Sequence, residues 1–469
     1  MKLYNTLTRS LDECKPLDGV QVRIYSCGPT VYDHAHIGNL SAYVYSDTLQ
    51  RVASMSGYTV HRAMNYTDVD DKTIRRSREQ FPEADPHVAL KLLTDKYITI
   101  FLEDMQRIGN DTEHVTFLRA TSPEIIQGMK DLITALHKKG FAYVADDGVY
   151  FSIDAYRKSG KTYGQLSEIT AADTSEARIQ NDEYDKESVH DFALWKTQKE
   201  GEPAWEFTLD GHDLKGRPGW HIECSVMSRQ ALGQPFDIHT GGVDHIFPHH
   251  ENEIAQSTAL DENPTMATMF VHSEHMLVDG RKMSKSAQNF YTLQDVVEKG
   301  FDPLAFRVKV LQSHYRNSVN FTWESLEAAQ NLLQSLRAWA DLKHQKHADL
   351  QNNVGEDYAA ALKTVIEALN DDLNTAKALA TFATLANQAE TKGVDLNKFQ
   401  HLLNIADRLL GLNLSNRPTI NDTQKSLITE RQAARDNKDW QKSDELRDEL
   451  AKQGIGLRDT AHGPIWFRQ

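Results

Sequence analysis

Residues 20–66 carry the pattern that most constrains how this chain can fold. Alternating apolar residues from Val20 to Ile24 predict a strand that ends at the turn of Gly28 and Pro29. A helix closed by a glycine should follow, and its apolar face is formed by Tyr45, Leu49 and Val52. A second strand-like stretch, YTVHRAMNY, begins next. Strand, helix and strand at this spacing make a βαβ unit, so the sequence predicts an α/β protein with a parallel sheet.

The segment YSCGPTVYDHAHIGN, residues 25–39, falls at the junction of the first strand and the helix. His36 and Asn39 should lie at the helix N-terminus, just beyond the carboxyl end of the strand. Unpaired backbone N–H groups and the helix dipole favour an anion such as phosphate there. Cys27, on the preceding turn, is either an ordinary buried residue or part of a site built with the residues that follow.

The remainder of the 469-residue chain predicts further domains. Residues 117–195 contain a hairpin-like stretch, GFAYVADDGVYFSID, and an acidic stretch, and are interpreted as an insertion between two halves of the sheet domain. After about residue 320, apolar residues recur every three or four positions, which predicts a helical bundle. A link with Gly, Asn and Pro precedes a last unit with a charged helix and a strand-like end.

Composition narrows the class of protein. The three cysteines are odd in number and far apart, which argues against a disulfide framework and leaves metal binding or chemistry. A net charge of −15 argues against an indiscriminate nucleic-acid binder, although a basic run such as DKTIRRSR could serve a partner or form a solvated face. No apolar run approaches the roughly 20 residues of a membrane span, and the N-terminus lacks a signal-peptide stretch. We therefore expect a cytoplasmic protein without a membrane partner.

Two further segments offer metal ligands. GWHIECS contains Cys224, and FPHHENE contains His249 and Glu253, which are four residues apart. That spacing puts both side chains on one face of a helix, whose first turn suits Pro248. Together with Cys27, these residues supply two thiolates, an imidazole and a carboxylate, a set that fits a four-ligand zinc site.

The residues alone leave alternatives to this metal site open. His250 is a possible ligand in place of its neighbour, because it lies three residues before Glu253. The histidine and glutamate also fit a surface pair, and Cys27 also fits a core position. Cys14 receives no role.

The segment KMSKS, residues 282–286, lies in a stretch of small residues that indicates a flexible loop. Its lysines, Lys282 and Lys285, could hold a polyphosphate, and the pentapeptide alone also fits any basic loop. Its pairing with a His-Ile-Gly step about 245 residues earlier is far more specific.

This pair of motifs resembles the two signatures of class I aminoacyl-tRNA synthetases, and further segments resemble the cysteinyl-tRNA synthetases among them. The matching segments are CGPTVYDHAHIGN, NYTDVDDK, DFALWK, GRPGWHIECS, FDIHTGGVDHIFPHHENEIAQS, KMSKSAQNF and DNKDWQKSDELRDELAKQGIGLRDT. The resemblance covers essentially the whole chain and is weakest at residues 165–190 and 340–357. Asn39 replaces the final histidine of the first signature, and its amide can donate a hydrogen bond instead.

The resemblance implies a fold and its division into domains. The expected architecture is α/β, with a Rossmann-like parallel-sheet catalytic domain that carries an insertion, then a helical bundle and a small mixed α/β anticodon-binding domain. The implied ranges are residues 1–116 and 196–295 for the catalytic domain, 117–195 for the connective insertion, 296–321 for a stem-contact connector, 322–412 for the bundle and 419–469 for the anticodon-binding domain.

The resemblance also implies an activity, in which cysteine and ATP form cysteinyl-adenylate and the cysteinyl group passes to tRNA(Cys). L-Cysteine, ATP with Mg²⁺ and tRNA(Cys) are the implied partners, and we expect a monomer. The implied catalytic and nucleotide-binding residues are His36, Gly38, Asn39, Lys282 and Lys285. One zinc ion per chain is implied on Cys27, Cys224, His249 and Glu253, where it would select the substrate thiol. The implied cysteine pocket comprises Gly28, Thr67 and Trp220, and the implied anticodon contacts are Arg435, Trp440, Asp444 and Asp459.

Three other functions fit the sequence less well. A mycothiol-type cysteine ligase resembles the catalytic half but lacks the anticodon-binding end that this chain has. A non-catalytic, zinc-stabilised tRNA-binding protein would not need both phosphate signatures. A zinc hydrolase fits less well, because four protein ligands leave no preset position for water.

Overall fold

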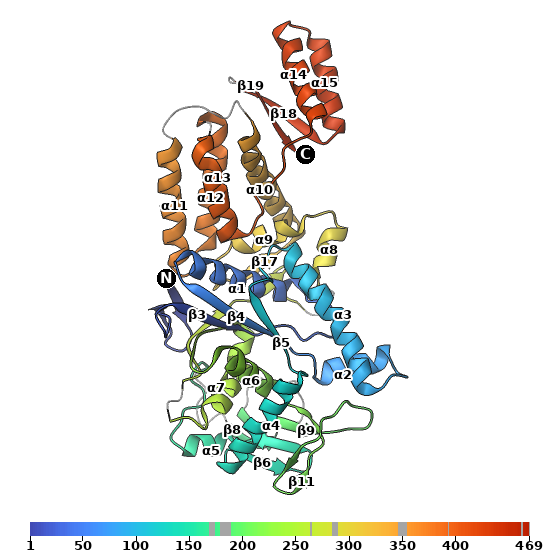
Figure 1. Cartoon of the computed structure of the whole chain (residues 1–469), viewed down its shortest axis with the longest axis vertical. Helices are drawn as coiled ribbons and strands as arrows, with labels where there is room; N and C mark the ends of the chain where they lie inside the picture. The colour runs from blue at the N-terminus through green and yellow to red at the C-terminus, as the bar shows by residue number, and fades with distance from the viewer. Residues whose placement is uncertain are drawn as a thin grey trace. The chain divides into compact units, whose positions relative to one another are not determined.

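The computed structural model describes residues 1–167, 174–178, 189–262, 265–283, 289–345, 354–392, 394–460 and 463–468. The chain divides into two compact units (Figure 1). Unit 1 comprises Met1–Asp295 with Tyr315–Asn320, and unit 2 comprises Val296–His314 with Phe321–Gln469. Among the described residues, none of the helices combines the length and the apolar character that crossing a bilayer requires.

A five-stranded parallel sheet organises unit 1. Its strand order is β14 (Ala267–Ser273), β13 (Phe236–Gly242), β3 (Gln21–Ser26), β4 (Thr59–Tyr66) and β5 (Val115–Arg119). Neighbouring strands pair in parallel throughout, and α1 (Ile37–Met55) connects β3 to β4. The βαβ unit and the parallel sheet expected from the sequence are therefore confirmed.

The first strand differs from the simple alternation that predicted it. Val20 precedes the strand and is 63% exposed, whereas Ile24, Tyr25 and Ser26 are buried in succession. Consecutive burial is typical of a central parallel strand, because helices cover both faces of such a sheet. The alternation therefore located the strand correctly but assigned Val20 to it wrongly.

The segment between β4 and α6 (Trp220–Leu232) forms several helices and an antiparallel sheet. Its helices are α2 (Asp71–Gln80), α3 (Pro86–Arg107), α4 (Pro123–Lys138) and α5 (Ile153–Lys158). The antiparallel sheet has the order β12 (Gly216–Pro218), β9 (Val189–Thr197), β7 (Gly148–Phe151) and β6 (Ala142–Ala145), with β8 (Thr174–Arg178) beside β9 and the small hairpin of β10 (Thr208–Leu209) and β11 (His212–Asp213) nearby in sequence. The expected hairpin is confirmed as β6 and β7.

Three strands run past the expected limits of the insertion. Strand β5 belongs to the parallel sheet and extends to Arg119, β9 of the antiparallel sheet ends at Thr197, and β12 continues that sheet to Pro218. Strands β5 and β12 are short, and only their pairing partners reveal the sheet to which they belong. The acidic stretch falls largely outside the described residues.

The second half of unit 1 returns to the parallel sheet through α6, β13, two short turns and α7 (Glu251–Thr258). The turns are η2 (Val243–His245) and η3 (Ile246–His250), and Phe247 within η3 has extended backbone angles. Phe247 is the residue of η3 with non-helical angles, so helical backbone runs from Pro248 through His250 into α7, and Pro248 lies in the first turn as the sequence indicated. The other strands are β1 (Lys2–Asn5), β2 (Ser10–Glu13), β15 (Met276–Val278), β16 (Arg281–Lys282) and β17 (Val319–Phe321), and α8 (Leu293–Glu298) follows β16.

Unit 2 is mainly helical, as the sequence predicts. Its elements are α9 (Pro303–Leu311), α10 (Trp323–Asp341), η4 (Leu342–His344), α11 (Val354–Asn370), α12 (Thr375–Lys392), α13 (Leu396–Leu410), α14 (Asp422–Asp436), α15 (Trp440–Lys452), β18 (Ile455–Thr460) and β19 (Gly463–Arg468). The periodic residues of α10 are buried at Leu326, Ala329, Leu333, Leu336 and Ala340. The last two strands form an antiparallel hairpin beside α14 and α15.

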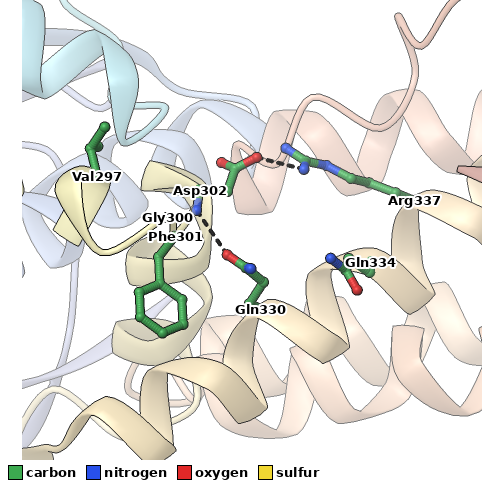
Figure 2. A pocket seen from close by; sticks show the side chains of 7 residues that line it. All are labelled: Val297, Gly300, Phe301, Asp302, Gln330, Gln334 and Arg337. Atoms are coloured by element: carbon green, nitrogen blue, oxygen red, sulfur yellow. Dashed lines mark hydrogen bonds and ion pairs between the residues drawn. The ribbon is translucent and has the colours of Figure 1, made fainter. Parts of the chain in front are cut away.

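A cavity of about 380 Å³ in unit 2 is lined partly by α10 (Figure 2). Asp302 caps α9 by accepting from the Leu304 N–H at 2.8 Å, and it pairs with Arg337 at 2.6 Å. The Asp302 backbone N–H donates to Gln330 Oε1 at 2.8 Å. The contacts with Arg337 and Gln330 join the start of α9 to α10, so the polar groups of Asp302, Gln330 and Arg337 have a structural explanation.

Candidate metal centre and nucleotide site

The candidate metal ligands come from three segments that meet at the parallel sheet. Cys27 follows β3 directly, and its N–H donates to Thr240 O of the neighbouring β13 at 3.3 Å. Cys224 lies on the second turn of α6, while His249 and Glu253 flank the start of α7. All four side chains are buried.

The structure brings these four side chains together. The Cys27 and Cys224 sulfurs, a His249 ring nitrogen and a Glu253 carboxylate oxygen lie within 4.8 Å of one another. Glu253 Oε1 is 3.0 Å from His249 Nε2 and 3.8 Å from the Cys27 sulfur, so one oxygen faces both ligands. We call these four residues the donor cluster.

A second set of possible metal ligands overlaps the donor cluster. It combines Cys27 and Glu253 with His239 and His250, again within 4.8 Å. His250 Nε2 is 3.4 Å from the Cys27 sulfur, and His239 Nε2 is 3.0 Å from Glu253 Oε2. The ambiguity between His249 and His250 that spacing leaves open therefore persists in the folded protein.

The chemistry of the donor cluster suits zinc. Burial raises the pKa of the Cys27 thiol well above its usual value, and hydrogen bonding to Cys224 and the nearby Glu253 carboxylate add to the effect, so this sulfur becomes a thiolate only when a cation lies beside it. Burial likewise lowers the pKa of His249 well below its usual value, so its imidazole is neutral and offers a lone pair. Sulfur and imidazole nitrogen are the donors that Zn²⁺ prefers, with a carboxylate as an accepted fourth ligand.

Further buried histidines surround the donor cluster. His221 Nδ1 is 2.8 Å from His249 Nδ1, and His250 Nδ1 is 2.8 Å from His272 Nε2. Burial lowers the pKa of His221 and of His272 to about 3, so both are neutral near pH 7. Sequence reasoning missed this group, because its members are spread along the chain and no spacing rule connects them.

The expected cysteine pocket adjoins Cys27. The Gly28 N–H donates to Asn65 Oδ1 at 2.8 Å, and Asn65 Nδ2 donates to Thr67 Oγ1 at 3.2 Å. A Cβ atom on Gly28 would lie 1.8 Å from the Asn65 carbonyl oxygen, so only glycine fits this close approach. Trp220 stacks on His249 with ring centroids 4.1 Å apart. Asn65, a polar residue near the end of β4, organises these contacts and was not singled out in the sequence.

The described residues at the edges of the KMSKS segment lie beside the His-Ile-Gly segment at the N-terminus of α1. His36 caps this helix, and its Nδ1 accepts from the Asn39 N–H at 3.2 Å. The Ile37 N–H donates to Tyr291 O at 2.9 Å, which brings the chain after the KMSKS segment beside His36. A Cβ on Gly38 would lie 2.4 Å from the Met283 side chain, so the glycine lets the second signature approach the helix closely.

Of the two lysines in the KMSKS segment, the structure describes only Lys282. Lys282 ends β16 and is exposed, and its carbonyl accepts from Asn289 Nδ2 at 3.1 Å. Lys285 lies outside the described residues. Its proposed role therefore rests on the sequence.

The expected anticodon residues gather in the last part of unit 2. Trp440 begins α15 and is 57% exposed, and the Arg435 guanidinium lies 5.7 Å from the centre of its ring. Arg435 also pairs with Asp459 of β18 at 3.2 Å. Asp444 is exposed on α15. Asp459 has a second partner that the sequence did not indicate, the buried Arg431.

Comparisons with known proteins identify three regions of the chain. Residues 13–331 match the family model of the tRNA synthetases class I (C) catalytic domain, residues 364–415 match the DALR domain, and residues 417–466 match the cysteinyl-tRNA ligase anticodon binding domain.

Similar proteins of known name extend over nearly the whole chain. A cysteine–tRNA ligase of Brachyspira hyodysenteriae is 39% identical, with 99% of each chain covered, and one of Chlamydia muridarum is 40% identical, with 98% of each covered. Among solved structures, a methionyl-tRNA synthetase of Mycobacterium tuberculosis aligns with a TM-score of 0.60 at 12% identity, covering 85% of this chain and 93% of that one. At such low identity the structural match concerns the fold alone.

Proposed function

The chain belongs to the cysteine–tRNA ligase family of class I aminoacyl-tRNA synthetases, and from this premise we propose the reaction that it catalyses. L-Cysteine and ATP first give cysteinyl-adenylate and pyrophosphate, and the cysteinyl group then passes to the 3′ terminal adenosine of tRNA(Cys). The observation that carries this proposal is the short connection between two sites. The donor cluster begins at Cys27, and the phosphate-binding helix end begins at His36 of the same loop.

The first step needs positioning more than a protein nucleophile. The carboxylate of cysteine attacks the α-phosphate of ATP, a new P–O bond forms, and the bond to pyrophosphate breaks. The helix N-terminus at His36, Gly38 and Asn39 would hold the phosphates, with Mg²⁺ accompanying ATP. Lys282 and Lys285 would stabilise the charge that develops on the departing pyrophosphate.

The donor cluster of Cys27, Cys224, His249 and Glu253 would hold a zinc ion. Its two thiol donors, where the overlapping set has one, support this set, because zinc prefers sulfur ligands. When bound, zinc favours a thiolate ligand over the hydroxyl of serine, since the reference pKa of a thiol is only about 8.5. Gly28 and Thr67 would shape the adjoining pocket, and the Trp220 ring would hold His249 in place by stacking.

The terminal part of unit 2 would bind the anticodon. The exposed Trp440 ring offers a surface on which an unstacked base can lie. Asp444 and Asp459 would accept hydrogen bonds from the N1 and N2 edge of a guanine. Arg435 would contact the same region from beside the Trp440 ring.

Cysteine-dependent exchange of pyrophosphate with ATP, followed by charging of tRNA(Cys), tests this proposal. We expect both activities, and we expect serine to support neither to a comparable extent. Exchange without tRNA charging, together with transfer of cysteine to an amino sugar, would instead favour the mycothiol-type ligase. Binding of tRNA without exchange would identify a non-catalytic tRNA-binding protein.

A further inference from the structure

Arg431 is a buried arginine in a small apolar core in the last part of unit 2. It lies on α14 with a side chain that is 1% exposed, and no hydrogen bond from its Nε is found among the described residues. It falls on the same helix face as Leu427 and Ile428, which pack against this core. The core itself consists of Ile420, Leu450, Ile455, Leu457 and Trp466.

Stability alone does not account for an arginine at this position. Burying a guanidinium costs several kcal/mol of desolvation free energy even when it has a partner. A well-packed apolar residue of similar volume is often neutral or stabilising in such a place. The core contacts therefore do not explain why this residue is charged, and its partner has to be considered.

The partner of Arg431 is Asp459 on β18. The guanidinium donates from both terminal nitrogens, at 2.7 Å to Oδ1 and 2.8 Å to Oδ2. This two-point contact fixes the plane of the carboxylate as well as its position. Asp459 is itself 37% exposed, so the buried arginine orients a carboxylate that faces solvent.

Arg435 contacts the same carboxylate less tightly than Arg431 does. Its NH1 lies 3.2 Å from Asp459 Oδ2, its side chain is 33% exposed, and its guanidinium also lies over the Trp440 ring. Exposed ion pairs contribute roughly 0–1 kcal/mol, so this contact can be exchanged for another at little cost. Arg431 is therefore the fixed partner of Asp459, and Arg435 is the exchangeable one.

The lone pairs of the carboxylate set what Asp459 can still bind. A carboxylate accepts at about four positions, two on each oxygen. Arg431 occupies one position on each oxygen, and the Arg435 guanidinium lies 3.2 Å from Oδ2 as an ion-pair partner, close enough to hinder a second donor there. Among the described residues no other side chain is found at Oδ1, so one position there is open, and release of Arg435 would open the second one on Oδ2. A guanine edge, which presents two parallel N–H donors, requires both positions.

We propose that Arg431 is a positioning residue for anticodon recognition, which fixes the plane of Asp459, and that a guanine edge displaces Arg435 from the same carboxylate. This inference rests on the proposed function. The displaced Arg435 remains beside Trp440, where its guanidinium can meet the RNA. The buried Arg431 also keeps Asp459 ionised, because its hydrogen bonds and charge hold the pKa of that carboxyl below its usual value.

The test compares tRNA(Cys) transcripts that carry guanosine, inosine or adenosine at the first anticodon position. Guanosine pairs with the U or C that ends each cysteine codon, inosine lacks only the 2-amino donor, and adenosine lacks the N1–H donor as well. The variants are Arg431→Met, Arg431→Lys and the control Arg447→Met. Arg447 is exposed on α15 and influences Asp459 only through its charge, so the control removes one positive charge without removing the two-point contact.

We expect wild-type enzyme to prefer guanosine over adenosine in kcat/KM for charging. Loss of one hydrogen bond to a charged group changes a binding constant by about tenfold or more. Arg431→Met should therefore reduce the preference for guanosine by roughly tenfold. Arg431→Lys should reduce it by less, because lysine keeps the charge but loses the two-point geometry. Arg447→Met should leave the preference within about twofold, and pyrophosphate exchange should be unchanged in all three variants.

Several outcomes would overturn the inference. If the Arg431 variants lower charging of all three transcripts by the same factor, Arg431 is a structural residue. The same conclusion follows if the last part of unit 2 is unfolded in these variants. An equal effect of Arg447→Met would show that net charge alone matters. Absence of charging by wild-type enzyme would contradict the proposed function itself, whereas wild-type charging with an unchanged base preference in Arg431→Met would contradict only this inference.

Discussion

Replacing Cys224 with serine is the sharpest perturbation of the donor cluster. Cys224 is buried beside Cys27, and the change keeps the size of the side chain while it exchanges a sulfur donor for an alcohol oxygen. An alcohol is a poor zinc ligand at neutral pH, since it ionises far less readily than a thiol. Cys224→Ser should therefore weaken zinc binding and leave the rest of the cluster in place.

The size of the effect follows from the four donors. Apparent free energies of zinc binding to structural sites are about 10–16 kcal/mol, which corresponds to roughly 2.5–4 kcal/mol for each of four ligands. At about 1.4 kcal/mol for each factor of ten, loss of one ligand should weaken zinc affinity by roughly 100-fold to 1,000-fold. Burying a hydroxyl in place of the thiol should cost only about 1–3 kcal/mol of folding stability.

Competition with a chromophoric chelator measures zinc affinity directly, and metal analysis should give one zinc per wild-type chain. Cys14→Ser is the matched control, because Cys14 is also buried but lies outside both sets of possible ligands. We expect Cys14→Ser to retain zinc. Metal-depleted wild-type enzyme should lose affinity for cysteine and discrimination against serine while still binding ATP, and X-ray absorption at the zinc edge should gain a sulfur contribution when cysteine is added.

Zinc binding by the overlapping set of ligands would contradict this prediction. If Cys27, His239, His250 and Glu253 hold the ion, zinc affinity should fall in His250→Ala and remain at the wild-type level in Cys224→Ser. Equal zinc loss from Cys14→Ser and Cys224→Ser would indicate that both substitutions lower zinc affinity by destabilising the folded protein. An unchanged sulfur contribution on addition of cysteine would rule out the proposed recognition of the substrate thiol.

Three further predictions concern the remainder of the chain. Lys285→Ala should slow adenylate formation sharply, measured by pyrophosphate exchange, and leave tRNA affinity nearly intact, because its charge acts mainly in the transition state. Trp440→Ala or Arg435→Ala should weaken charging of tRNA(Cys) but spare pyrophosphate exchange, and equal loss in both assays would contradict a role confined to the anticodon. Burial raises the pKa of Asp104 on α3 from 3.8 in the unfolded chain to about 6. The stability that the protonated carboxyl provides is therefore fully present below about pH 3.8 and is lost as the pH rises through 6, where the free energy of unfolding falls by up to about 3 kcal/mol. Asp104→Asn should therefore raise the melting temperature above that of wild type at pH 7, and much less near pH 4.

The sequence predicted the parts of the fold that depend on local signals. The turn after β3, the N-terminus of α1 at His36 and the helical periodicity of α10 follow from residue patterns within a few turns of chain. One assignment failed because it depends on packing at a distance: Val20 fits an alternating strand but precedes β3.

The candidate site shows the same division between local and distant causes. The His249 and Glu253 pair could be anticipated from a spacing of one helical turn, and the two side chains do lie 3.0 Å apart. Spacing could not separate His249 from His250, because both imidazoles reach the same group of donors. Asn65 and Arg431 were missed for another reason: each acts through one partner that lies on a different element.

The insertion supports the donor cluster through its contacts with α7. Glu251 accepts hydrogen bonds from three backbone N–H groups between Gly164 and Ser167, and the Ser167 hydroxyl donates to the same carboxylate. The hydroxyl of Tyr163 donates to Asn252 on the next position of the helix. Buried carboxylates that accept several N–H bonds are costly to disturb, so this loop fixes the start of α7 firmly. Because two of the four members of the donor cluster flank that helix start, the geometry available to a metal depends on a segment that contributes no ligand itself.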